Sequence, residues 1–87
     1  MKSKKDVKSD SFDETLEAIG KKLTELRLKK GYTSHATFAT DHNLPPIQYW
    51  RMEKGKANIT LKSLHKVLSI HGISIDTFFN GDLSKKR

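Results

Sequence analysis

The stretch that decides the fold runs from Ser34 to Gly55 and reads SHATFATDHNLPPIQYWRMEKG. Ser34 is a good helix N-cap, so we expect a short helix to begin directly after it. Asn43 tolerates the left-handed backbone conformation better than most residues, and two prolines follow it closely. Because proline suits the first turn of a helix, a second helix is predicted from about Pro46 to Lys54. Two short helices joined by a tight turn are typical of a helix-turn-helix.

The spacing within this stretch assigns an inner and an outer side to each short helix. Ala39 is small enough to lie where the two helices touch, and Asn43 makes the turn. Tyr49 and Met52 are three residues apart and should face the core. The opposite side of the second helix is then free to enter the major groove of DNA.

Helices are also predicted on both sides of the helix-turn-helix. A first helix, from about 12 to 30, is indicated by a capping box at Ser11 and Glu14 and a stop at Gly31. Thr60 and Ser74 should cap two more helices, which end near Gly72 and Gly81. Apolar residues recur at helical spacing in all three helices: Phe12, Leu16, Ile19, Leu23, Leu26, Leu61, Leu64, Val67, Leu68, Ile75, Phe78 and Phe79. The chain is therefore expected to be all-α, a compact orthogonal bundle of five helices.

Composition limits what else the chain can be. Its 87 residues suffice for one domain, and without cysteine neither disulfides nor thiolate metal sites can hold it together. We expect a disordered basic tail at residues 1–11, the folded domain at 12–81 and a short basic tail at 82–87. The net charge of +7 favours polyanionic partners, although much of it lies in the two tails. With no signal peptide or membrane-spanning stretch evident, a cytoplasmic location is expected.

Two segments carry a resemblance to a known family. The segment YWRMEKG at 49–55 is similar to the pattern apolar-x-Arg-apolar-Glu-x-Gly, and residues 61–68 and 72–79 resemble the last two helices of the same family. The region from about Ile19 to Gly81 thus resembles the lambda repressor and Cro-like regulators, also called the XRE family. The resemblance implies a five-helix fold and regulation of transcription, usually by a homodimer on a two-fold-related site in double-stranded DNA.

The resemblance also implies roles for particular residues. Arg27 and Glu53 match a structural pair that links the first helix to the end of the recognition helix. His35 matches a phosphate contact at the start of the preceding helix. The tip of the recognition helix either reads thymine methyl groups by apolar contact or leaves base reading to Gln48 and Arg51. The full set implied to contact DNA is His35, Pro46, Ile47, Gln48, Trp50, Arg51, Lys54, Lys56 and Asn58.

The C-terminal end holds more apolar residues than one short helix normally hides. We therefore expect a homodimer interface there, formed by Ile73, Ile75, Phe78, Phe79 and Leu83. No arrangement of catalytic residues and no Gly-rich phosphate loop is visible, so the chain is not expected to be an enzyme. The four histidines do not share the spacing of a metal site, and no cofactor or small-molecule ligand is indicated.

Three functions follow from these features. The first is a sequence-specific regulator of transcription, and in particular a repressor. The second is an antitoxin that binds both DNA and a toxin, which the lack of a long partner-binding extension disfavours. The third is a module for protein association that has lost DNA binding, which is favoured only by the proline and isoleucine at the helix tip.

Overall fold

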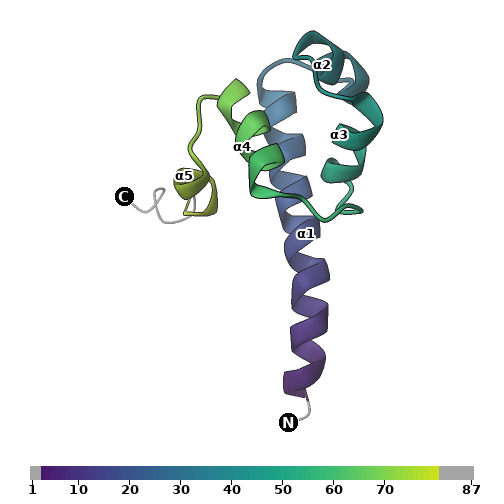
Figure 1. Ribbon diagram of the computed structural model, residues 1–87, viewed down its shortest axis with the longest axis vertical. Coiled ribbons are helices and arrows are strands. Elements are labelled where there is room, and N and C mark those ends of the chain that lie inside the picture. Colours follow the sequence, from purple (N-terminus) through teal and green to yellow (C-terminus); the bar gives the residue numbers. More distant parts are fainter. Residues whose placement is uncertain (1–2, 81–87) are drawn as a thin grey trace.

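Helix α1 (Ser3–Lys29) is the longest element and supports the rest of the molecule (Figure 1). The computed structural model describes the backbone of residues 3–80 and the side chains of residues 12–80. Four further helices follow within that range: α2 (His35–Asp41), α3 (Pro46–Glu53), α4 (Leu61–Ile70) and α5 (Ile75–Phe79). The described part of the chain contains no strand, so the all-α fold of five helices is confirmed.

Three of the helices begin at the residues that the sequence predicted. The hydroxyl oxygen of Ser34 accepts a hydrogen bond from the amide of Thr37, at 3.1 Å. Thr60 accepts in the same way from the amide of Ser63, at 3.0 Å, and Ser74 accepts from that of Thr77, also at 3.0 Å. Each cap satisfies an amide that has no partner inside its own helix, and this fixes where α2, α4 and α5 start.

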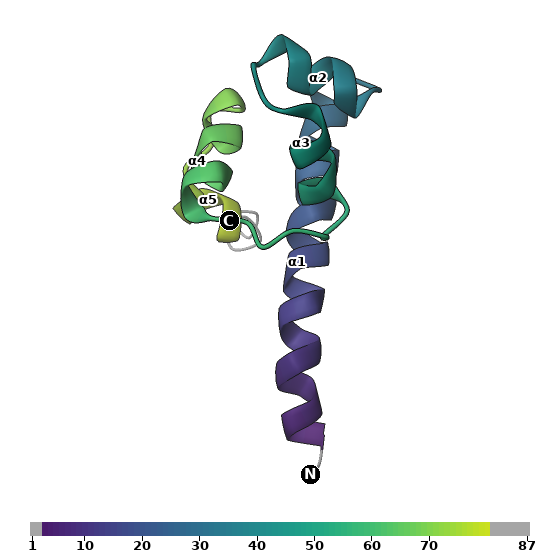
Figure 2. The ribbon, with the colours of Figure 1, turned by 45° about the vertical axis from the view of Figure 1, so that its right-hand side comes forward.

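The start of α1 differs from the expectation. A disordered tail was expected over residues 1–11, but α1 is already helical at Ser3, so Ser11 lies inside a helix and is not its N-cap. Helical hydrogen bonds are local, and the chain has no glycine or proline before Gly20 to interrupt them. Figures 1 and 2 show this first part of α1 extending away from the other helices. Residues 1–2 and the predicted tail at 82–87 lie outside the described residues.

The core lies between the second half of α1 and the four shorter helices. Its largest fully buried side chains are Tyr49, Phe38, Leu23, Leu64, Leu68 and Val67, which come from α1, α2, α3 and α4. Ala39 is also fully buried, as expected for a small residue at the contact between α2 and α3. The first residue of the predicted α1 stripe, Phe12, remains 55% exposed because it precedes the region that the bundle covers.

Two turns orient α3. Asn43 adopts a φ of 58°, as predicted, and turns the chain between α2 and α3. Gly55 adopts a φ of 69° after the end of α3. The amides of Gly55 and Lys56 then bond to the carbonyl oxygens of Met52 and Arg51, at 3.2 and 2.9 Å, which is the Schellman arrangement. In the described part of the chain, no helix has the length and apolar character that a membrane crossing requires.

Candidate nucleic-acid interface

Helix α3 has one face in the core and one in solvent. Tyr49 is only 1% exposed, and Met52 is also buried against the rest of the core. The residues that the sequence assigned to base contacts lie on the other face, and all of them are exposed: Pro46, Ile47, Gln48, Trp50 and Arg51. The structure therefore brings the predicted reading residues together on one solvent-facing surface of α3.

The first residue of α2 adjoins this surface. The His35 ring lies 6.4 Å from the Trp50 ring, measured between centroids, with the two planes inclined at 48°. Trp50 is 36% exposed, so part of its side chain remains open to solvent. His35 is half-buried beside it. The start of α2 and the middle of α3 thus form one continuous surface.

The turn after α3 is bonded to Arg51. The Arg51 side chain donates from Nη2 to the carbonyl oxygen of Lys56, at 2.9 Å. Because the amide of Lys56 bonds to the Arg51 carbonyl oxygen, the two residues are joined in both directions. The guanidinium keeps its remaining N–H donors for a ligand. The other three residues predicted to contact DNA, Lys54, Lys56 and Asn58, are all exposed around this turn.

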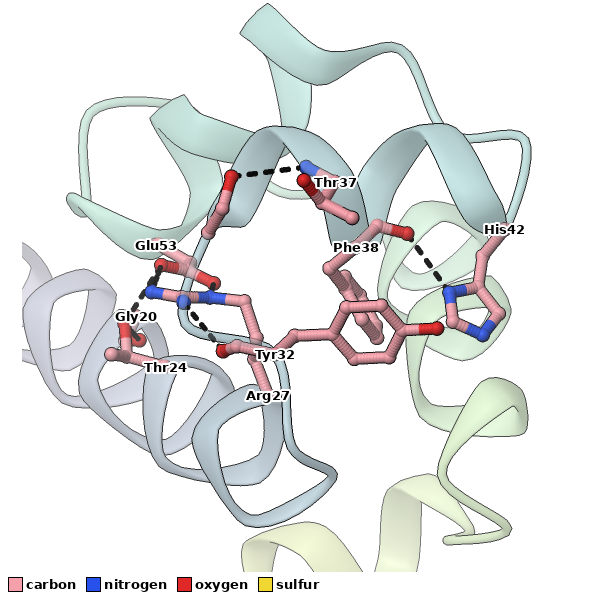
Figure 3. Close-up of polar contacts among 9 residues, drawn as sticks. Gly20, Thr24, Arg27, Tyr32, Thr37, Phe38, His42 and Glu53 are labelled. Atoms are coloured by element: carbon pink, nitrogen blue, oxygen red, sulfur yellow. Dashed lines mark hydrogen bonds and ion pairs between the residues drawn. The ribbon is translucent and has the colours of Figure 1, made fainter.

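The predicted pair of Arg27 and Glu53 forms a buried ion pair between α1 and α3 (Figure 3). Arg27 donates from Nε and Nη2 to the two carboxylate oxygens of Glu53, at 2.8 and 3.1 Å. Its Nη1 donates to the carbonyl oxygen of Tyr32, at 2.9 Å, which ties the chain between α1 and α2 to the same group. One side chain therefore links α1, the connection between α1 and α2, and the end of α3.

The pair shifts the pKa values of both partners. Its hydrogen bond to Glu53 raises the pKa of Arg27 above the ordinary value, although burial opposes this. Burial alone would raise the pKa of the Glu53 carboxyl, but the hydrogen bonds and charge of Arg27 outweigh it and hold that pKa below the ordinary value. Both groups are thus stabilised in their charged forms near neutral pH.

Sequence reasoning missed two residues of α1 that meet the same end of α3. The Thr24 hydroxyl lies 3.1 Å from Oε1 of Glu53 and 3.0 Å from the carbonyl oxygen of Gly20. A Cβ atom on Gly20 would fall 2.2 Å from the backbone oxygen of Glu53, so only glycine permits this approach of the two helices. A glycine inside a helical pattern, four and seven residues before Thr24 and Arg27, was the available signal.

The predicted dimer residues divide into buried and exposed groups. Phe78 belongs to the core, and Ile73 and Ile75 pack against it half-buried. Phe79 is 47% exposed, and its ring lies 5.2 Å from that of Phe78. Leu83 lies outside the described residues. A groove of about 580 Å³ lies between α1 and the α5 end of the chain, and its lining residues are Lys22, Glu25, Leu26, Leu28, Lys29, Ile73, Thr77 and Phe78.

Two of the histidines lie against Phe38. The His71 ring stacks on that of Phe38, at 5.4 Å and 8°, and the His42 ring lies 4.6 Å away on α2's C-cap. Burial, followed by the nearby charges of Lys30 and His42, lowers the pKa of His71. Across residues 12–80, no three potential metal ligands of the His, Asp or Glu type come together.

Comparison with known proteins places the chain in a family. No protein-family model matches the chain, and no solved structure matches it. A curated relative, the control protein C.MunI of a Mycoplasma species, is 34% identical over 68 residues, which are 78% of this chain and 90% of the relative. That match spans nearly the whole relative, and the structure shows a helix-turn-helix with an exposed second helix. The chain therefore belongs to the family of this control protein, a family of helix-turn-helix regulators.

Proposed function

We propose that the protein is a sequence-specific DNA-binding regulator that represses transcription by occupying its operator. The observation that carries the proposal is the two-sided character of α3. Its inner side is held by the core and by the buried pair of Arg27 and Glu53, while its outer side carries Gln48 and Arg51 into solvent. The relative's description as a control protein agrees with a regulatory role.

In this proposal α3 lies in the major groove and its exposed side chains meet base edges. Gln48 can form paired hydrogen bonds with adenine, and Arg51 can do so with guanine O6 and N7. The hydrogen bond from the Arg51 guanidinium to the Lys56 carbonyl oxygen restricts the side chain before DNA binds. Less of the binding free energy is then lost in ordering the side chain.

The residues around α3 contribute more to affinity for DNA than to discrimination between DNA sequences. Lys54, Lys56 and Asn58 are exposed at the turn after α3, where the phosphate backbone would pass. His35, at the start of α2 and beside Trp50, supplies a further phosphate contact away from this turn. Contacts of this kind set the register of the protein on the duplex and make binding dependent on salt.

Two copies are proposed to bind together through the α5 end. Phe79 is exposed beside the apolar groove between α1 and α5, so a second copy can cover both features at once. A two-fold dimer of this kind would place its recognition helices about one DNA turn, roughly 34 Å, apart. We expect two chains per palindromic duplex, and Phe79→Ser should reduce this to one. Strict 1:1 binding by the parent protein at saturation would overturn the dimer.

Duplex binding at several salt concentrations tests the central proposal. Duplexes bound by the protein are selected from a randomised pool, and the affinity of the best sequence is compared with that of unselected DNA. We expect a preferred sequence whose affinity falls linearly with salt on logarithmic axes. Absence of binding to any duplex at physiological salt would overturn the proposal and favour protein association.

A promoter fusion tests the direction of regulation. With the selected sequence placed across a promoter, we expect the protein to lower transcription of a reporter gene. Arg51→Ala should weaken the effect, because discrimination at one base pair of the operator would be lost. Increased transcription from the same fusion would contradict repression and leave DNA binding intact.

A further inference from the structure

Ile47 is the most exposed of the large apolar side chains in the described part of the chain, at 75%. It lies on the first turn of α3, directly after Pro46, and no core residue needs it there. An isoleucine so fully in water gains nothing for folding, since burial is the source of apolar stabilisation. The side chain is therefore free to be covered by a ligand that presents an apolar group.

The neighbours of Ile47 limit what that ligand can be. Trp50 is three residues further along α3 and partly exposed on the same side of the helix, so the two form a small apolar surface. Gln48 and Arg51 are also exposed, on the side of Ile47 that faces away from Trp50 along the turn of the helix. An apolar surface beside hydrogen-bonding side chains fits a partner that presents polar and apolar groups side by side.

The major groove offers such a partner in one form. Base edges there present hydrogen-bond donors and acceptors, and the thymine C5-methyl group is the apolar exception. The N-terminal residues of a recognition helix are those that approach base edges most closely. Ile47 occupies that place in α3, and its apolar surface is continuous with the proposed DNA interface.

We propose that Ile47, with Trp50 beside it, contacts a pyrimidine C5-methyl group, so that the operator carries a thymine opposite the first turn of α3. This inference rests on the proposed DNA-binding function. It has a consequence for the nature of the recognition. Because the contact is made to the methyl group and not to a hydrogen-bonding edge, methylation of a cytosine at that position should also strengthen binding.

The test uses the duplex selected by the protein from the randomised pool, with one thymine at a time replaced by uracil. Uracil differs from thymine only in lacking the methyl group, so base pairing is preserved. We expect a loss of about fourfold in affinity at one position of each half-site, the value of one buried methyl group. At that position, cytosine is then compared with 5-methylcytosine, which should bind about fourfold more tightly.

Two variants assign the effect to Ile47. In Ile47→Ala, the preference for thymine over uracil at that position should become clearly smaller than in the parent protein, because most of the apolar surface that covers the methyl group is gone. Phe12→Ala is the matched control, since Phe12 is also exposed but lies on the projecting part of α1, and it should keep the parent's preference. The inference is overturned if no uracil substitution weakens binding, or if Ile47→Ala keeps the parent's full preference for thymine. If no duplex is bound at all, the proposed function fails, and with it this inference.

Discussion

The two sides of α3 differ in how many contacts they make with the rest of the fold. The inner side meets α1 through a buried two-bond ion pair, a threonine hydroxyl and a glycine that permits backbone contact. The outer side has an exposed isoleucine, glutamine and arginine, of which only Arg51 is bonded, and that to its own turn. The orientation of the helix is thus determined by one set of residues and its surface chemistry by another.

This separation has a practical meaning for substitutions. Changes on the inner side should alter stability, because they remove or strain buried contacts. Changes on the outer side should alter DNA binding and leave stability nearly unchanged, because those side chains contact little of the fold. The following experiments test that division, beginning with the largest expected effect.

Loss of the carboxylate at position 53 should have the largest effect. Glu53→Ala leaves Arg27 buried without its counter-charge, and breaking a buried pair in this way costs about 3–5 kcal/mol of unfolding free energy. Chemical denaturation measures the change. Glu25→Ala, which removes an exposed glutamate from α1, is the control and should shift stability by less than about 0.5 kcal/mol. Equal stability of the two variants would show that the pair is superficial.

The second-largest loss of stability is expected from adding a methyl group at position 20. Gly20→Ala places a Cβ against the backbone of Glu53, and overpacking of this kind costs about 1–3 kcal/mol. In an open helix the same substitution would stabilise by about 1 kcal/mol, so the sign of the change is decisive. Thermal unfolding, with Lys21→Ala as an exposed control on α1, gives the measurement. A rise in the melting temperature would contradict the close contact between α1 and α3.

On the outer side, substitutions at Arg51 and Lys56 should have different effects on DNA binding. The first should reduce discrimination between DNA sequences, and the second should reduce affinity for all of them. Arg51→Ala should cost about 1–3 kcal/mol of discrimination at one base pair, while the free energy of unfolding stays close to the parent value. Lys56→Ala should weaken all duplexes alike and make the salt slope shallower by about 1. If Arg51→Ala weakened every duplex equally, the arginine would be a phosphate contact, and base reading would belong to Gln48 and Ile47.

The ion pair of Arg27 and Glu53 should also make the free energy of unfolding depend on pH in the acid range. Because the folded-state pKa of Glu53 is below its unfolded value, its contribution to stability is present above about pH 4.3 and is lost as the pH falls through the folded-state value. The stability difference between the parent protein and Glu53→Gln should therefore shrink between pH 5 and pH 2, a range chosen to span both values. Urea denaturation at several pH values measures it. A difference independent of pH would contradict the lowered pKa.

The smallest effect is expected at Tyr49. Its hydroxyl is buried without a hydrogen-bond partner among the described residues, and burial, together with the Glu53 carboxylate, raises the pKa of Tyr49. Tyr49→Phe removes a buried hydroxyl that forms no hydrogen bond with the described residues, so stability should stay within about 1 kcal/mol of the parent value. A loss larger than that, in the same denaturation assay, would reveal a hydrogen bond from this hydroxyl in solution.

Sequence reasoning predicted the parts of the fold that depend on local chemistry. The caps at Ser34, Thr60 and Ser74 and the left-handed turn at Asn43 are confirmed, since each depends on one side chain and its neighbours in the chain. The start of α1, expected at about residue 12, lies at Ser3, since the polar residues before Ser11 include no glycine or proline that would stop a helix.

The site was predicted as a list of positions rather than as a geometry. The predicted pair of Arg27 and Glu53 is confirmed by the ion pair in the structure. It could be predicted because the family resemblance gave both positions. The roles of Gly20 and Thr24 depend on how helices distant in sequence meet, which no local pattern encodes. The roles assigned to the exposed residues of α3 remain predictions.

The glycine at position 20 has a consequence beyond stability. Helix α1 contacts α3 on one side, at Gly20, and forms one wall of the groove beside α5, at Lys22 and Leu26, within two turns of the same helix. In the proposed dimer, α1 therefore sets the distance between the two copies of α3 that would contact DNA. Any side chain at position 20 that pushes α3 outward would change that distance. Such a variant should prefer half-sites at a different spacing, even with every base-contacting residue intact.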